Sequence, residues 1–123
     1  MNKKFPSISE LCEGSFLLFN KPLCWTSFDI VGKVRKIIRK ANGGNKIKIG
    51  HAGTLDPLAT GLLILCTGSF TKKITEFQEF EKEYTGNMVL GATTPSYDLE
   101  TEVTETVDIS HLNKYDIIKT SKK

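Results

Sequence analysis

The chain has 123 residues, 25% of them charged, and a formal net charge of +3. This length fits one domain, and the charge permits a nucleic-acid partner but excludes a non-specific polybasic binder. Cys12, Cys24 and Cys66 are widely spaced and form no CxxC pair, which argues against a metal site and favours buried free thiols in a reducing cytoplasm. The apolar run within residues 1–19 is too short and too charged for a signal peptide or a membrane span.

The first part of the chain predicts a strand followed by a helix. Residues 15–19 are a short apolar run, typical of a buried strand. Residues 26–42 predict a helix, because Thr26 and Asp29 have capping-box spacing and the following apolar residues share one face. That face holds Ile30, Val34, Ile37, Ile38 and Ala41, and the other faces hold mostly Lys33, Lys36, Arg39 and Lys40.

The rest of the chain mixes both kinds of element. Residues 46–50 and 62–68 predict strands, and residues 70–80 have aromatic and aliphatic side chains at helical spacing. Residues 82–91 and 101–107 predict the two strands of a hairpin, and residues 108–123 open like a helix. This mixture, with its hairpin near the end, predicts an α+β fold.

Residues 50–61, GHAGTLDPLATG, place one carboxylate at the centre of a loop with glycines at both ends. Glycines fit such a loop when the backbone needs unusual dihedral angles or a close approach. Pro57 keeps Asp56 out of the helical region, and Leu55, Leu58 and Leu62 are expected to anchor the flanks in a core. A rigid carboxylate beside open space suits a nucleophile or a base, whereas each residue alone is explained equally well as a turn former. The residues by themselves leave both interpretations open.

Three stretches together resemble the TruB family of tRNA pseudouridine synthases. GHAGTLDPLATGLL resembles the catalytic signature of the family, and NKPLCWTS resembles its Lys-Pro-x-Gly-x-Thr/Ser-Ser segment. EKEYTGNMVLGATTPSYDLET resembles the strand-and-loop region that follows, so the resemblance extends from about residue 14 onward. It implies a cytoplasmic isomerase that converts uridine to pseudouridine in the T arm of tRNA without a metal or organic cofactor. It also implies a mixed, mainly antiparallel sheet with flanking helices.

The resemblance assigns roles to five residues. Asp56 corresponds to the catalytic aspartate, which acts in its ionised form on the ribose, as a nucleophile or by drawing a proton from it. Tyr84 corresponds to the active-site tyrosine that packs on the target base and takes its C5 proton, and His51 to a histidine that contacts RNA beside the extruded base. Lys21 and Pro22 correspond to the motif that shapes the floor of the site. Without the resemblance, Tyr84 is an ordinary strand tyrosine, and Lys21 is a solvated lysine at a turn.

The chain departs from the family pattern at one position and in its length. Cys24 stands where the family has glycine. If that position needs a positive φ, the backbone of Cys24 is strained; if the glycine only allows a close approach, the thiol narrows the space at that position. Its neighbour Trp25 is expected to pack on the core. The basic residues after Thr26, with Lys46 and Lys48, are expected to contact phosphates weakly and in a salt-sensitive way.

Family members extend well beyond the length of this chain. The additional part would supply a thumb insertion that grips RNA, the rest of the sheet and an arginine that pairs with the catalytic aspartate. We therefore expect residues 1–123 to be the N-terminal portion of a catalytic domain, without its C-terminal portion and inactive by itself. The alternatives are a non-catalytic RNA-binding remnant, one half of a split enzyme, and an unrelated α+β domain with an accidental match.

Overall fold

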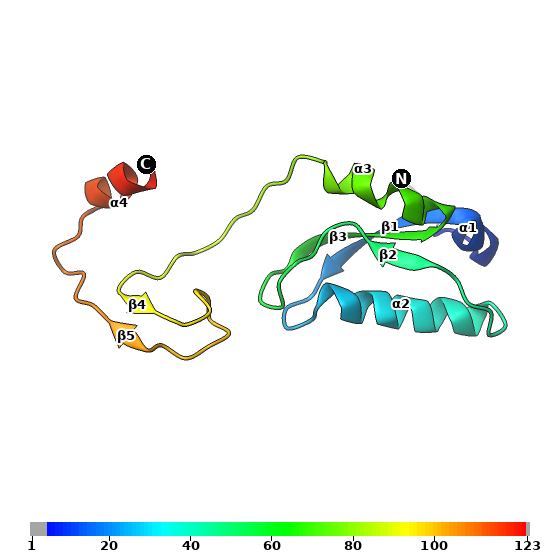
Figure 1. The fold of residues 1–123 in the computed structure, drawn as a ribbon, viewed down its shortest axis with the longest axis horizontal. Coiled ribbons are helices and arrows are strands. Elements are labelled where there is room, and N and C mark those ends of the chain that lie inside the picture. Colours follow the sequence, from blue (N-terminus) through cyan, green and yellow to red (C-terminus); the bar gives the residue numbers. More distant parts are fainter. Residues whose placement is uncertain (1–4, 123) are drawn as a thin grey trace. The chain divides into compact units, whose positions relative to one another are not determined.

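The structure is a computed structural model that describes residues 5–122 and divides at residues 82 and 83 into two units, each described by itself. Residues 1–4, the start of the N-terminal stretch, and Lys123, the end of the expected last helix, lie outside the described residues. The first unit contains α1 (Ile8–Glu13), β1 (Gly14–Lys21), α2 (Ser27–Ala41), β2 (Ile49–His51), β3 (Gly61–Gly68), a 3-10 helix (Ser69–Lys73) and α3 (Ile74–Gln78) (Figure 1). The second contains β4 (Ala92–Thr93), β5 (Glu105–Thr106) and α4 (Lys114–Ser121). This mixture confirms the predicted α+β class.

A three-stranded antiparallel sheet in the order β1-β3-β2 forms the centre of the first unit. β1 pairs with β3 along its whole length, from Gly14 opposite Gly68 to Lys21 opposite Gly61. β2 pairs with the other edge of β3, where His51 lies opposite Leu65. The loop from residue 52 to residue 60 connects β2 to β3, so it enters the sheet directly beside Lys21.

The core lies between this sheet and α2, which runs along one face of it (Figure 1). The buried apolar side chains come from both layers and from α1: Leu11, Ile30, Val31, Val34, Ile38, Ile49, Leu63 and Leu65. The expectation that Ile37 and Ala41 share the buried face is wrong, because both are exposed. Ile37 lies about 100° around the helix axis from Ile38, which turns it away from the sheet, and Ala41 is the last residue of α2.

The predicted start of α2 is confirmed in detail. The Thr26 hydroxyl accepts a hydrogen bond from the backbone N–H of Asp29, at 3.0 Å, and the Asp29 carboxylate accepts one from the Thr26 N–H, at 2.8 Å. Hydrogen bonds from the hydroxyl and N–H of Thr26 lower the pKa of the Asp29 carboxyl. The same arrangement begins α1, where Ser7 and Glu10 form a second capping box.

Two predicted elements of the first unit are shorter or different in kind. The strand expected over residues 46–50 begins only at Ile49, because β3 ends at Gly68 and offers no partner to the residues before Lys48. The helix expected over residues 70–80 is a 3-10 turn followed by the five residues of α3. Within residues 5–122, no helix is long and apolar enough to cross a membrane.

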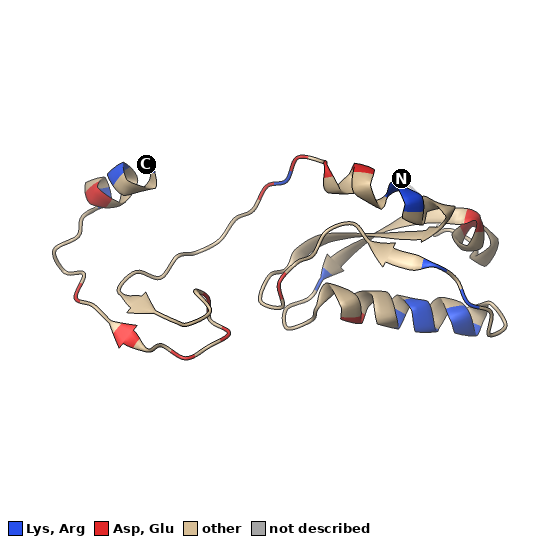
Figure 2. Ribbon diagram, viewed as in Figure 1, with Lys and Arg blue, Asp and Glu red and all other residues tan. Residues whose placement is uncertain are grey.

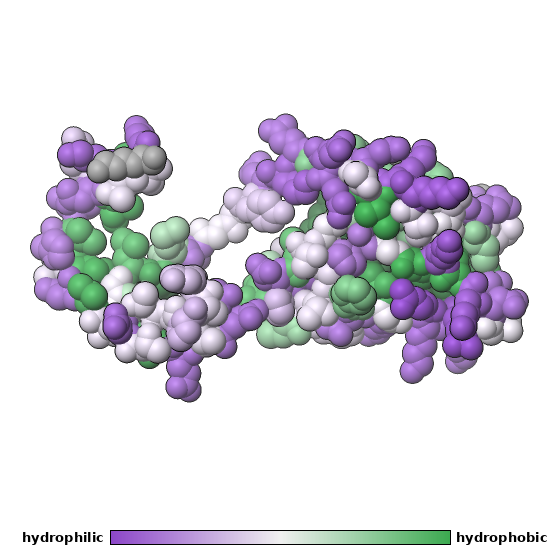
Figure 3. Space-filling view, viewed as in Figure 1, coloured by the Kyte–Doolittle hydropathy of each residue, from purple (hydrophilic) through white to green (hydrophobic). Residues whose placement is uncertain are grey.

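The second unit contains the expected hairpin, but at shifted positions. Ala92 lies opposite Thr106 and Thr93 opposite Glu105, so β4 falls in the stretch that was expected to be the connection. The expected strand over residues 82–91 is wrong, because in the unit as described this stretch forms no strand, and only the carbonyl of Gly91, at its end, accepts from the opposite side, from the N–H of Val107 at 2.9 Å. Its apolar side chains are exposed, including Met88 at 87%, and apolar residues gather on the surface of this unit (Figure 3). A strand pattern alone does not supply the backbone partner that a strand requires.

Candidate functional site

The loop of residues 52–60, here called the Asp56 loop, presents the Asp56 carboxylate to solvent. The backbone N–H of Ala59 donates to the carbonyl of Asp56, at 3.0 Å, and closes a turn just after it. Gly53 and Gly61 have φ values of 112° and 133°, which confirms the need for glycine at these positions. Of the leucines expected to anchor the flanks, Leu55 packs against the core, whereas Leu58 and Leu62 are exposed.

The residue before Asp56 is fixed by the first residue of α2. The backbone N–H of Leu55 donates to the Ser27 hydroxyl at 3.0 Å, and that hydroxyl donates to the Leu55 carbonyl at 3.4 Å. The Ser27 side chain is only 2% exposed, so these hydrogen bonds form in an environment that excludes water. No role was predicted for Ser27 from the sequence. Its place directly after the predicted N-cap Thr26 was the available signal, because it put Ser27 at the start of the helix.

The residue after Asp56 is fixed by Lys21, at the end of β1. The Lys21 side chain is completely buried, and its Nζ donates to the carbonyls of Pro22 at 3.0 Å, Trp25 at 2.6 Å and Pro57 at 3.3 Å. The carbonyl of Pro57 also accepts from the backbone N–H of Cys24, at 2.8 Å. A buried ammonium is tolerated only when its donors are satisfied, and three carbonyls meet that need. The alternative of a solvated lysine is therefore wrong.

Asp56 thus lies between two residues whose backbones are bonded to buried polar side chains, while its own carboxylate is exposed. Among the described residues, every buried side-chain nitrogen or oxygen has a hydrogen-bond partner. The loop therefore fixes the backbone on both sides of Asp56 and leaves the carboxylate in water. That combination suits a group which must be ionised and correctly positioned before its substrate arrives.

His51 lies at the end of β2, where the Asp56 loop begins. Its Nδ1 is 2.6 Å from the carbonyl of Gly53, and because a carbonyl only accepts, Nδ1 carries the proton of this hydrogen bond. In the neutral ring, Nε2 is then an acceptor. The ring of Phe28 meets the imidazole edge to face, with centroids 5.7 Å apart. The imidazole is therefore held in one orientation at the mouth of the loop.

The other two predicted site residues are exposed. Pro22 follows Lys21 directly, and its carbonyl accepts one of the hydrogen bonds from the buried amine. Tyr84 belongs to the second unit, in the extended stretch before β4, and its side chain is 71% exposed. The structure places His51, Asp56, Lys21 and Pro22 in the first unit. Tyr84 lies in the second unit, which is described by itself. The roles of all five remain predictions.

Cys24 has a φ of 62°, in the left-handed region that favours glycine. Of the two alternatives for this position, the strained one is therefore confirmed. The expectation of three buried thiols is wrong for Cys12 and Cys24, which are exposed, and holds for Cys66, whose pKa is raised by burial. Trp25 packs against the core as expected, and the Lys33 Nζ lies 4.7 Å from the centre of its ring.

Residues 35–123 match the family profile described as TruB family pseudouridylate synthase, N-terminal domain. The match covers more than half of the chain, and the chain belongs to the TruB family of pseudouridylate synthases.

The individual relatives support the same assignment. A protein from Flavobacterium johnsoniae named tRNA pseudouridine synthase B is 56% identical over 115 residues, which are 93% of this chain and 50% of that protein. A protein of the same name from Bacteroides thetaiotaomicron is 58% identical over 102 residues, 83% of this chain and 42% of the relative. A third protein of this name, from Chloroherpeton thalassium, is 53% identical over 105 residues, which are 85% of this chain and 43% of that protein. The chain spans about half the length of the curated relatives it matches.

The positive φ of Cys24 generates a prediction about stability. Replacement Cys24→Gly should raise the free energy of unfolding by about 1 kcal/mol, because glycine adopts this conformation without the clash of a Cβ atom. Chemical denaturation of the two proteins measures the difference. Cys24→Ala is the matched control, since it removes the thiol but keeps the Cβ, and it should not stabilise. Equal gains from both replacements would show that the thiol, not the backbone, is responsible.

The hydrogen bonds of Ser27 generate a second prediction. Replacement Ser27→Ala leaves the N–H of Leu55 without its partner and should lower the free energy of unfolding by about 1 to 3 kcal/mol. Amide hydrogen exchange at Leu55 should accelerate more than global unfolding explains. Ser69→Ala is the control, because the Ser69 hydroxyl donates to the Glu13 carbonyl at the opposite end of β3. Unchanged exchange at Leu55 in Ser27→Ala would contradict the proposed anchoring of the Asp56 loop.

Proposed function

We propose that the protein to which this chain belongs is a cytoplasmic enzyme that isomerises uridine to pseudouridine in the T arm of tRNA. One observation carries the proposal: in a member of this family, the Asp56 carboxylate is exposed on a loop whose residues on either side, Leu55 and Pro57, are hydrogen-bonded to buried side chains. The names of the relatives support tRNA as the substrate. The T arm follows from the resemblance of the motifs to the bacterial branch of the family.

The reaction rearranges one nucleotide without adding or removing atoms. The bond from uracil N1 to ribose C1′ breaks, the base turns, and a bond forms from C5 to C1′. The proton on C5 leaves, and N1 gains one. In this scheme the ionised Asp56 acts on the ribose, either as a nucleophile or by drawing a proton from it, and both roles need a carboxylate that is fixed before the substrate binds.

The neighbouring residues have supporting roles in the proposal. His51, with Nδ1 bonded to Gly53, offers its ring and Nε2 to RNA beside the extruded base. Tyr84 stacks on that base, and its phenol oxygen takes the C5 proton while the hydroxyl releases its own proton to solvent. Lys21 and Pro22 form the floor of the site, and the Lys21 amine acts as a positioning group, because its three carbonyl partners include the residue after Asp56.

Replacement Asp56→Asn tests the central assignment, because it keeps the shape of the side chain and removes its charge. The assay uses residues 1–123 joined to the remaining part of the Flavobacterium johnsoniae relative, with unmodified tRNA as substrate and detection of pseudouridine by chemical labelling. We expect the rate to fall by at least about a thousandfold. Asp108→Asn is the matched control at an exposed aspartate and should retain the rate. An undiminished rate in Asp56→Asn would exclude Asp56 as the catalytic carboxylate.

The same assay tests Tyr84. Tyr84→Phe keeps the aromatic face and loses the hydroxyl, whereas Tyr84→Ala loses both. We expect turnover to fall in both variants and RNA affinity to fall mainly in Tyr84→Ala, because base stacking is worth about 1 to 3 kcal/mol. Tyr115→Phe provides the control at an exposed tyrosine of α4. Full turnover by Tyr84→Phe would remove the proton-transfer role, and full affinity in Tyr84→Ala would remove the stacking role.

A further inference from the structure

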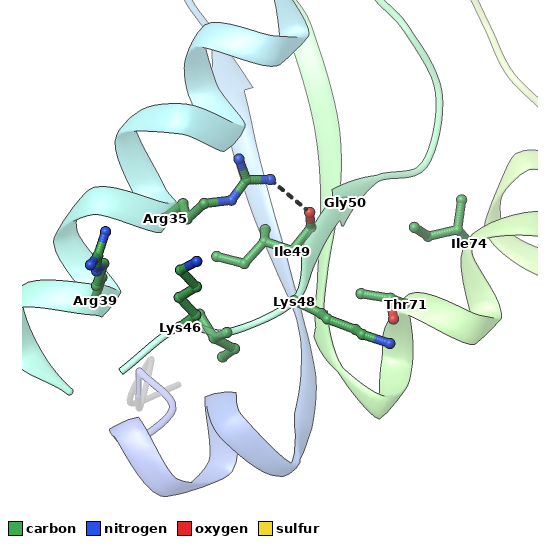
Figure 4. Close-up of a pocket in the computed structure, with 9 residues that line it drawn as sticks. Arg35, Arg39, Lys46, Lys48, Ile49, Gly50, Thr71 and Ile74 are labelled. Atoms are coloured by element: carbon green, nitrogen blue, oxygen red, sulfur yellow. Dashed lines mark hydrogen bonds between the residues drawn. The ribbon is translucent and has the colours of Figure 1, made fainter. Parts of the chain in front are cut away.

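A groove in the first unit is bordered by four cationic side chains: Arg35, Arg39, Lys46 and Lys48. We call it the cationic groove. It has a volume of about 570 Å³ and lies between the later turns of α2, the segment that leads into β2, and the 3-10 and α3 helices (Figure 4). None of the residues assigned to the reaction lines it. The groove is therefore a feature that the proposed chemistry does not explain.

The sequence places these cations on the groove in two ways. Arg35 and Arg39 are four residues apart, so they follow one another on the same side of α2. Lys46 and Lys48 alternate with Ile47 and Ile49, whose side chains turn toward the core while the two lysines remain exposed. One row of charge therefore comes from a helix and the other from an extended segment.

Two of the cations are held in place by backbone carbonyls. An Nη atom of Arg35 donates to the carbonyl of Ile49 at 3.3 Å (Figure 4), and Nε of Arg39 donates to the carbonyl of Gly44 at 2.9 Å. These bonds leave the remaining guanidinium N–H groups available to a ligand. The groove is thus lined by oriented donors as well as by net charge.

Among the residues that the structure describes, no acidic side chain neutralises this charge. Across residues 5–122, none of the four cations forms an ion pair. In Figure 2, Lys and Arg mark the later turns of α2 and the segment before β2, whereas the acidic residue of this helix lies near its N-terminal end. A row of unneutralised cations attracts a ligand with repeated negative charge.

The floor of the groove is apolar and depends on a glycine. Ile74 of α3 and Ile49 of β2 line it, and a Cβ atom at Gly50 would lie 2.7 Å from the Cδ1 atom of Ile74. Gly50 therefore allows α3 to approach β2 closely and close one side of the groove. An apolar floor between cationic walls fits a ligand that carries its negative charges on a less polar frame, as the sugars and phosphates of RNA do.

The position of the groove connects it to the Asp56 loop. The edge strand β2 runs from Ile49, in the groove, to His51, at the mouth of the loop. Asp56 lies six residues after Gly50, so their backbones are at most about 22 Å apart. One continuous RNA segment is therefore long enough to occupy the groove and reach the loop.

We propose that the cationic groove binds the phosphate backbone of the RNA substrate next to the nucleotide that is presented to Asp56. This inference rests on the proposed function for the identity of the RNA. The groove supplies affinity and orientation but no base-specific contacts, because its donors face phosphates and carry no sequence information. Substrate binding in the first unit then has two parts, with chemistry at the loop and backbone recognition along β2.

The test compares two double variants of the 123-residue chain that lose the same charge. Lys46→Gln with Lys48→Gln removes two cations from the groove, and Lys114→Gln with Lys119→Gln removes two exposed lysines of α4 that do not line it. Binding of a T-arm hairpin is measured by fluorescence anisotropy between about 50 and 200 mM salt. Circular dichroism and thermal unfolding check that all three proteins fold alike.

We expect the groove variant to lose about tenfold in affinity and its slope of log affinity against log salt to fall by about 1 to 2, while the control changes less than about twofold. Equal effects of the two double variants would overturn the proposal. The proposal would also be overturned if the groove variant lost affinity for inorganic phosphate or for phosphatidylglycerol vesicles but bound the hairpin as the unchanged protein does.

The same variants in the completed enzyme separate this inference from the proposed function. Groove variants should raise KM for tRNA and leave kcat unchanged, since phosphate contacts act on binding and not on the reacting atoms. If the completed enzyme makes no pseudouridine although the hairpin still binds through the groove, the proposed function fails and the groove stands. Normal KM in the groove variant would overturn the groove and leave the proposed function intact.

Discussion

The buried amine of Lys21 is the point on which the candidate site depends. It joins three backbone segments, namely the end of β1, the turn that leads to α2, and the Asp56 loop. A charge in this position must be matched by acceptors, and here only backbone carbonyls supply them. Any movement of the loop away from β1 would leave the ammonium poorly solvated. The loop position is therefore enforced by the energetic demand of a buried charge, and Ser27 adds a second attachment on the other side of Asp56.

Helix α2 links the core to both parts of the proposed RNA site. Its apolar side packs on the sheet through residues such as Val31 and Ile38. Its first residue, Ser27, holds the Asp56 loop, and its later turns carry Arg35 and Arg39 to the cationic groove. Because Ser27, Arg35 and Arg39 all belong to this one packed helix, the distance between the Asp56 loop and the cationic groove is set by the same contacts that stabilise the first unit.

The two units satisfy their backbones in different ways. In the first, the pairing of β1 with β3 over eight residues gives a continuous ladder. In the second, strand pairing covers two residues on each side, and much of the local order comes from polar turns. Asp98 shows this, since hydrogen bonds from the Ser96 hydroxyl and the Glu100 N–H lower the pKa of its carboxyl. The apolar side chains of the second unit remain at its surface, because a ladder of two residues creates no sheet face that could cover them.

The sequence by itself determined the features that depend on near neighbours. The capping pair Thr26 and Asp29, most of the buried face of α2 and the strands β1 and β3 follow from short-range spacing, and the GHAGTLDPLATG string identified the family and the candidate carboxylate. Strand pairing in residues 82–91 was predicted wrongly, because a strand needs a partner that local spacing does not reveal.

Only the tertiary structure decided how distant residues combine. The burial of Lys21 beside Pro57, the bonds between Ser27 and Leu55, and the meeting of Arg35 with Lys48 at one groove join residues that are 36, 28 and 13 positions apart. The sequence shows all of these lysines, but it does not show which is buried. Lys21 is a buried cation bonded to backbone carbonyls, whereas Lys46 and Lys48 are exposed. What separates them is the register of β1 against β3, which places Lys21 opposite Gly61 where the Asp56 loop enters the sheet. A register is set by the packing of whole strands, so no local pattern around Lys21 encodes it.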